Sequence, residues 1–95
     1  MSAPVSLTSV VKCNDNLVTA PMDGEIVILS VERGSYFGLD EIGTEIWQRL
    51  EAPVRVEALC DALVAKYDAD RSIIERDVLE LLENLVAEGL VTLAA

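Results

Sequence analysis

The residues of this chain that could do chemistry are its carboxylates and two cysteines. The 95 residues include 17 Asp and Glu, 7 Lys and Arg, and no histidine. Because histidine is the commonest general base and a frequent metal ligand, its absence removes most catalytic and metal-site patterns. Cys13 and Cys60 form no Cys-x-x-Cys pair, and Cys60 falls on the apolar face of a predicted helix, where a thiolate is disfavoured. We therefore expect no catalytic residues, no metal site and no cofactor.

The charge of the chain limits its partners. A net charge of −10 repels the phosphates of nucleic acids and the surfaces of anionic membranes. No apolar run approaches the roughly 18 residues of a membrane span, and residues 1–8 lack the pattern of a secretory signal peptide. The sequence predicts a cytoplasmic protein that binds neither nucleic acid nor membrane and prefers neutral or basic partners.

Turn signals divide the first forty residues into short strands. Asp23-Gly24 lies between two apolar runs, which is a strong hairpin signal, and Gly34 can supply the positive φ of a second turn. We expect an antiparallel meander of three strands at 17–22, 25–31 and 35–39. Residues 5–13 alternate weakly and are either an extra strand or an extended N-terminal arm.

Three helices follow the strands. Asp40 is placed to cap a helix at 41–51, apolar residues recur with helical spacing over 56–67, and Ser72-x-x-Glu75 resembles a capping box that opens a helix ending at Gly89. Residues 90–93 read as a short extended tail. Strands followed by helices predict a single α+β domain over residues 1–95, with winged helix-turn-helix architecture.

The third strand keeps one edge without a partner in this arrangement. An unpaired strand edge can accept an extended peptide as an added strand, with main-chain hydrogen bonds supplying affinity. The residues that we expect at this edge are Ser35, Tyr36, Phe37, Gly38 and Leu39.

The last helix carries two apolar stripes. Ile74, Val78, Leu81 and Leu85 complete a core stripe, and the second stripe is either extra core or one wall of a groove beside the free strand edge. In a helix-turn-helix protein this helix would contact DNA, but it carries two arginines against five acids over 71–88, which disfavours that function. The residues predicted to form the groove wall are Glu75, Leu79, Leu82, Glu83 and Val86.

The order of these motifs resembles a known family. Tyr36-Phe-Gly-Leu-Asp, then Ile46-Trp47, then Arg76-Asp77-Val78 with the leucines that follow and Gly89-Leu90-Val91, is similar to the PqqD family of RiPP recognition elements, in particular the leader-binding proteins of lasso-peptide biosynthesis. The resemblance spans residues 15–92, and Asp40 stands where relatives often carry Asn. Since Asp and Asn both cap helices, this departure puts little in doubt.

The resemblance implies a non-catalytic chaperone for a ribosomally made precursor peptide. It implies that the leader segment binds as a strand beside residues 35–39 and against the last helix, and is presented to a leader peptidase or other modifying enzyme. The alternative that we keep is a self-association or regulatory module, in which the free edge pairs with a second copy to give a homodimer.

Overall fold

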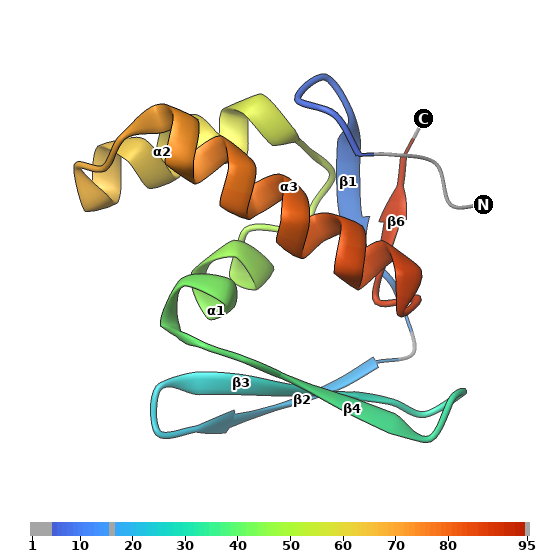
Figure 1. The fold of residues 1–95 in the computed structure, drawn as a ribbon. Coiled ribbons are helices and arrows are strands. Elements are labelled where there is room, and N and C mark those ends of the chain that lie inside the picture. The colour runs from blue at the N-terminus through green and yellow to red at the C-terminus, as the bar shows by residue number, and fades with distance from the viewer. Residues whose placement is uncertain (1–4, 16, 95) are drawn as a thin grey trace.

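The computed structural model describes residues 5–15 and 17–94, which form two small sheets and three helices (Figure 1). In chain order the elements are β1 (Val10–Cys13), β2 (Leu17–Met22), β3 (Glu25–Ser30), β4 (Ser35–Leu39), α1 (Glu41–Gln48), β5 (Val54–Arg55), α2 (Val56–Tyr67), α3 (Arg71–Ala87) and β6 (Val91–Leu93).

The larger sheet has the order β2-β3-β4 and is antiparallel throughout. The first hairpin turns at Asp23 and Gly24, whose φ angles are 54° and 84°, and Gly34 has a φ of 68° in the second turn. Both central residues of a type I′ hairpin turn need a positive φ, which explains why an Asp-Gly pair marks this turn. The α+β class and the three-stranded antiparallel sheet are confirmed, and the winged helix-turn-helix label stays a prediction.

The second sheet has the order β5-β1-β6 and joins both ends of the described chain. Residues 10–13 are thus a strand, and it lies outside the larger sheet. Residues 91–93, expected as a tail, also form a strand, with Val11 opposite Leu93 and Cys13 opposite Val91. Residues 1–4 of the expected arm and Asn16 of the expected turn lie outside the described residues.

The N-terminal segment also begins α2. Arg55 precedes this helix and makes no side-chain capping hydrogen bond. Instead, the backbone amides of Val56 and Glu57 donate to the carbonyl oxygens of Ser9 and Leu7 at 2.9 and 3.0 Å. Because the first amides of a helix lack partners within it, these two bonds replace a capping side chain and hold residues 7–9 against the helix.

The ends of the other helices follow local signals, with two corrections. Asp40 caps α1 as predicted, accepting from the Gly43 amide at 2.8 Å, but α1 ends at Gln48 rather than at residue 51. The cap of α3 is Asp70, which accepts from the Ser72 amide at 2.9 Å, so the predicted capping box at Ser72 is wrong. Gly89 ends α3 with a φ of 76°, as predicted.

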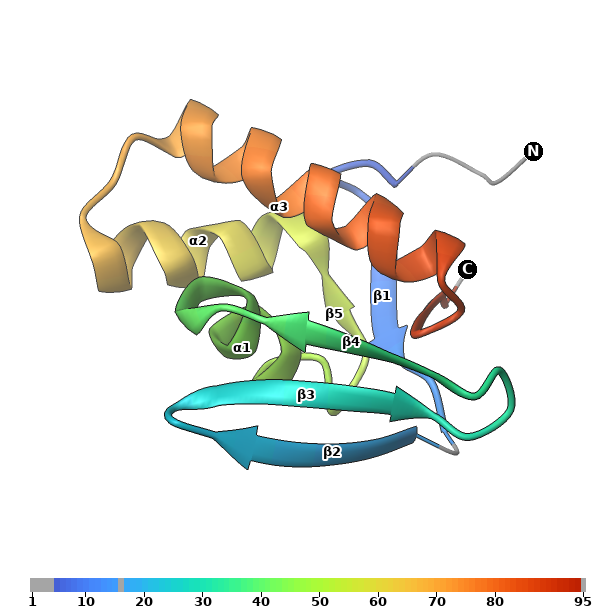
Figure 2. The same ribbon diagram turned by 60° about the horizontal axis from the view of Figure 1, so that its bottom comes forward.

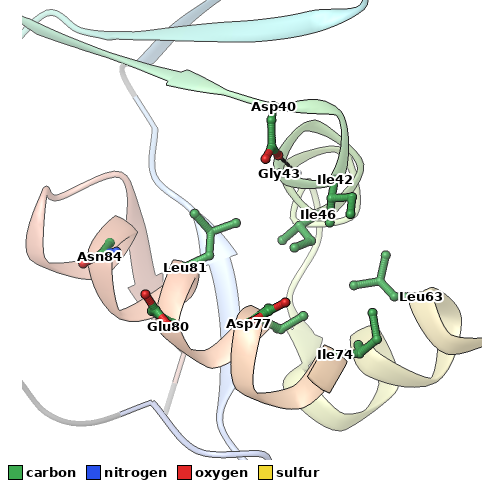
Figure 3. Close-up of a pocket in the computed structure, with 11 residues that line it drawn as sticks. Asp40, Ile42, Gly43, Ile46, Leu63, Ile74, Asp77, Glu80, Leu81 and Asn84 are labelled. Atoms are coloured by element: carbon green, nitrogen blue, oxygen red, sulfur yellow. Dashed lines mark hydrogen bonds between the residues drawn. The ribbon is translucent and has the colours of Figure 1, made fainter. Parts of the chain in front are cut away.

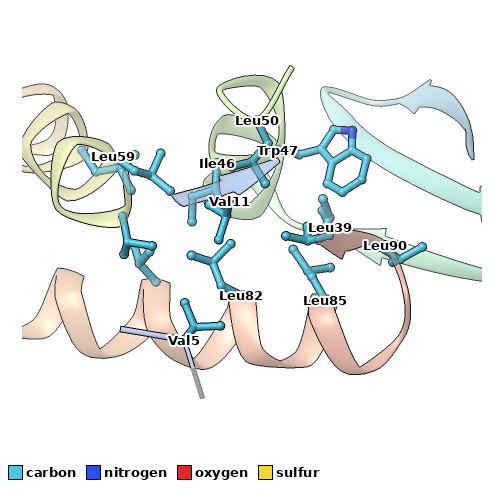
Figure 4. Packing of buried hydrophobic residues seen from close by; sticks show 14 of the residues in the cluster. Val5, Val11, Leu39, Ile46, Trp47, Leu50, Leu59, Leu82, Leu85 and Leu90 are labelled. Atoms are coloured by element: carbon cyan, nitrogen blue, oxygen red, sulfur yellow. The ribbon is translucent and has the colours of Figure 1, made fainter. Parts of the chain in front are cut away.

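Apolar side chains from both sheets and all three helices form one buried cluster (Figure 4). It includes Ile28 from β3, Trp47 from α1, Leu63 from α2 and Leu82 from α3. The helices cover only one face of the β2-β3-β4 sheet (Figure 1). Within the described part of the chain, no helix is both long and apolar enough to cross a membrane.

Candidate functional site

One edge of β4 is open. Over the described residues, β4 pairs with β3 only, while the N-terminal strand β1 pairs with β5 and β6 (Figure 2). A β-strand exposes alternate amides and carbonyls along each edge. The open edge of β4 can therefore form the main-chain hydrogen bonds of an added strand.

The side chains of β4 alternate between the two faces of the sheet. Leu39 is 4% exposed and Phe37 is half-buried, whereas the Tyr36 side chain is 78% exposed on the opposite face. A Cβ atom built at Gly38 would meet nothing within 4 Å. A peptide backbone can therefore approach Gly38 closely, and the five predicted edge residues are contiguous in one accessible strand.

A pocket of about 330 Å³ lies where β4 runs into α1 (Figure 3). Its floor is apolar and comes from all three helices, and α3 supplies one side with Asp77, Glu80, Leu81 and Asn84. The complete lining is Asp40, Ile42, Gly43, Ile46, Leu63, Ile74, Asp77, Val78, Glu80, Leu81 and Asn84.

The rim of this pocket is acidic. The Asp40 carboxylate is held by its cap hydrogen bond to the Gly43 amide, and Asp77 lies 3.5 Å from the guanidinium of its neighbour Arg76. Glu80 is exposed and takes part in no ion pair among the described residues. An apolar floor with an anionic rim suits an apolar side chain followed by a cationic one.

The predicted groove wall on α3 does not line this pocket. Leu82 is fully buried at 0% exposure, Leu79 and Val86 are half-buried against the core, Glu75 pairs with Arg71 at 2.8 Å, and Glu83 is exposed. Residues two apart on a helix point about 200° away from each other, so Leu79 and Leu81 lie on nearly opposite faces. At Leu82 the second stripe is thus extra core, whereas Leu81 is half-buried against the core and lines the pocket. The other residues of the predicted core stripe are buried as expected: Ile74, Val78 and Leu85.

The N-terminal segment adds to the core on this side of α3. Val5 is 5% exposed and belongs to the same buried cluster as Leu82, and Figure 4 shows it at α3. Leu7 packs against the same cluster. These residues extend the core toward the second stripe, which leaves Leu81 at its margin. The weak apolar alternation of residues 5–13 was the feature of the sequence that could have indicated this packing. A contribution of the five predicted wall residues to peptide binding stays a prediction.

No other chemistry gathers at the site. Among residues 5–15 and 17–94, no group of three or more Cys, Asp or Glu side chains is arranged to hold a metal ion. Cys13 and Cys60 are free thiols, and burial raises the pKa of both. Raised thiol pKa values disfavour the reactive thiolate.

Comparison with known proteins gives both a family and relatives. The family model described as coenzyme PQQ synthesis protein D (PqqD) matches residues 25–91. Two proteins of Rhodopseudomonas palustris, each named PqqA binding protein, are 46% and 43% identical to this chain over 66 residues. These residues are 70% of this chain and 63% of each relative, so the chain matches less than two thirds of their length.

Solved structures share the same arrangement of elements. TbiB1, in complex with the TbiA(beta) leader peptide, is 41% identical with a TM-score of 0.77, covering 84% of this chain and 93% of that one. The PqqD part of Methylobacterium extorquens PqqCD, a stand-alone RiPP recognition element, has a TM-score of 0.78 at 23% identity, covering 93% of this chain and 94% of that one. The second likeness concerns the fold alone.

Proposed function

Because the chain belongs to the PqqD family, we propose that it binds the leader segment of a ribosomally made precursor peptide and catalyses no reaction itself. The observation that carries this proposal is the open edge of β4 beside an apolar pocket. TbiB1, which is 41% identical, was solved with a leader peptide bound, and this supports the same class of ligand here.

The leader would bind as a fourth strand of the larger sheet. Its backbone would pair with Ser35–Leu39, and every second side chain would point to the inner side of the sheet, as Phe37 and Leu39 do. At the Leu39 end, such a side chain would enter the pocket between α1 and α3. There it would contact Ile42 and Leu81, two apolar residues of the lining.

The acidic rim would select among leaders. Asp77 and Glu80 stand beside the apolar floor, and the whole chain carries a net charge of −10. We expect the matching leader to place an aliphatic or aromatic residue in the pocket and Lys or Arg within one or two positions of it. A basic residue there would form charge-assisted hydrogen bonds with Glu80 or Asp77.

The energetics suit reversible capture. Ordering a disordered leader costs roughly 2–5 kcal/mol. Several main-chain hydrogen bonds at about 1 kcal/mol each, and two or three buried side chains at about 1.5–3 kcal/mol each, exceed that cost. We expect a dissociation constant in the micromolar range, which allows both capture of the precursor and its release.

The captured precursor would then be presented to an enzyme. We propose a leader peptidase or another modifying enzyme of the same biosynthetic pathway as that partner. The cytoplasm, where precursor peptides are synthesised, is the compartment we expect, and the two free thiols suit its reducing conditions.

Titration with a labelled peptide tests the proposal. The probe is a fluorescein-labelled synthetic leader with the sequence of the precursor that we expect to be encoded beside this protein. The control is a peptide of the same composition in scrambled order. We expect saturable binding of the leader alone, with slowed amide exchange along β4. Equal binding of both peptides, or no saturation at 100 μM, would refute it.

A further inference from the structure

The face of the β2-β3-β4 sheet that points away from the helices is apolar. Seven large hydrophobic side chains are strongly exposed among the described residues, and five of them lie on this side: Val18, Met22, Leu29, Val31 and Tyr36, at 51%, 59%, 40%, 63% and 78%. With the half-buried Val27, we call these six residues the outer face.

The register makes the outer face continuous. Val18 lies opposite Leu29 on β3, and Leu29 lies opposite Tyr36 on β4, so one row crosses all three strands. Directly opposed side chains on one face are only about 5 Å apart. Figure 1 shows the helices on the other face of the sheet alone.

Burial within this chain does not require an apolar outer face. In β3, Ile28 is fully buried on the inner face at 0% exposure, whereas Leu29 on the outer face is 40% exposed. An antiparallel strand with one face in water normally alternates apolar and polar residues. Single exposed hydrophobic residues are common, but a continuous group of them marks an interaction surface.

The charges around the outer face indicate the chemistry of its partner. Asp23, Glu25 and Glu32 are exposed in the turns and strand ends that border it. Arg33 is the sole cation of residues 17–39, and its guanidinium lies 3.7 Å from the carboxylate of Glu88, at the end of α3. A second copy would bring acids against acids, whereas a surface rimmed by Lys and Arg would complement this border.

We propose that the outer face docks the processing enzyme, through an apolar enzyme surface bordered by Lys and Arg. This inference rests on the proposed function, since it names the surface that would present the bound leader. The outer face lies across the sheet from the pocket and leaves the β4 edge exposed. Leader and enzyme can therefore bind at the same time. The backbone of Tyr36 would contact the leader, and its side chain would contact the enzyme.

Two outer-face variants and a matched control test this docking. The variants are Val18→Lys, on the strand farthest from the β4 edge, and Leu29→Thr, which places a polar, β-branched residue suited to a strand in the centre of the sheet. The control is Ala65→Lys, which adds the same charge at an exposed position of α2. The binding partner is the purified modifying enzyme that we expect to be encoded beside this protein, titrated without leader by biolayer interferometry. Leader affinity is measured separately.

We expect both outer-face variants to bind the enzyme at least about tenfold more weakly, with leader affinity unchanged and with the control like the wild type. Enzyme affinity within twofold of the wild type in both folded variants would overturn the proposal. So would a wild-type protein that ignores the enzyme, or one that forms a stable dimer dissociated by Val18→Lys. Failure of the wild type to bind leader would instead refute the proposed function, because that affinity is read independently.

Discussion

Leu81 and Leu79 provide a matched test of where the leader side chain binds. Both are half-buried leucines of α3, but only Leu81 lines the pocket. Truncation to alanine removes three carbon atoms, worth up to about 2.4 kcal/mol when fully buried by the ligand. Because Leu81 is already half-buried in the free protein, about half of that contact is new. We expect Leu81→Ala to weaken leader binding by about 1.2 kcal/mol, or roughly sevenfold.

Fluorescence anisotropy with the labelled leader measures both affinities, and urea unfolding followed by circular dichroism measures both stabilities. Each truncation should lower the free energy of unfolding by about 1–2 kcal/mol, less than a fully buried leucine would. Similar stabilities make Leu79→Ala a control for indirect effects of a loosened helix.

The reasoning would be refuted by the opposite order of affinities. If Leu79→Ala weakened binding several-fold while Leu81→Ala left it unchanged, the leader would contact the face predicted from the sequence. The N-terminal segment that packs near that face would then have to move on binding. Equal losses in both variants would indicate that affinity depends on the rigidity of α3 and not on the pocket.

Three further results follow from the same structure. Strand amides alternate between the two edges, so of Phe37 and Gly38 one amide faces the open edge and the other faces β3. Proline at the first position should weaken leader binding about tenfold with stability retained, and proline at the second should destabilise the sheet in urea unfolding. Leu82→Glu should cost at least about 3 kcal/mol of unfolding free energy by burying a charge, and circular dichroism would show the lost fold. Hydrogen bonding to Lys66 lowers the pKa of Glu45, so the Glu45 carboxylate stabilises the fold fully above its ordinary pKa of 4.5 and loses this effect as the pH falls below that value. Glu45→Gln should therefore be less stable than the wild type at neutral pH, and acid unfolding should show the difference in stability shrinking below that pH.

The elements that sequence analysis located best depend on local chemistry. The Asp23-Gly24 turn, the Asp40 cap and the Gly89 helix end each need a particular residue at a particular backbone conformation. The apolar spacing of residues 56–67 also predicts that α2 is a helix. Signals of this kind are complete within a few residues, so no knowledge of the rest of the chain is needed.

The second sheet could not be predicted in the same way. β5 has two residues and β6 has three, and neither contains enough alternation to show a period. Their strand character comes from pairing with β1, which is about 40 and 80 positions away in the chain. The start of α2 depends on the same long-range packing, since its amides are capped by the backbone of Leu7 and Ser9.

The extent of the buried face of α3 was not settled by the sequence, for a related reason. Apolar residues occupy more than half of its circumference, so periodicity alone does not decide which part faces the core. Val5 belongs to the same buried cluster as Leu82, so the buried face of α3 extends from the predicted core stripe to Leu82. Ile74, Val78 and Leu85 are buried as predicted, so the difference is confined to the margin of the stripe, at Leu81.

The pairing of β1 bears directly on the proposed function. A free N-terminal strand would compete with any leader for the β4 edge, and competition within one chain acts at an effective concentration of about millimolar. A leader of micromolar affinity would lose much of its binding to such a competitor. In the structure, β5 and β6 occupy both edges of β1, and the Ala94 amide donates to the Val10 carbonyl at 2.7 Å. The second sheet thus keeps the chain's own strand from the edge that we propose for the peptide.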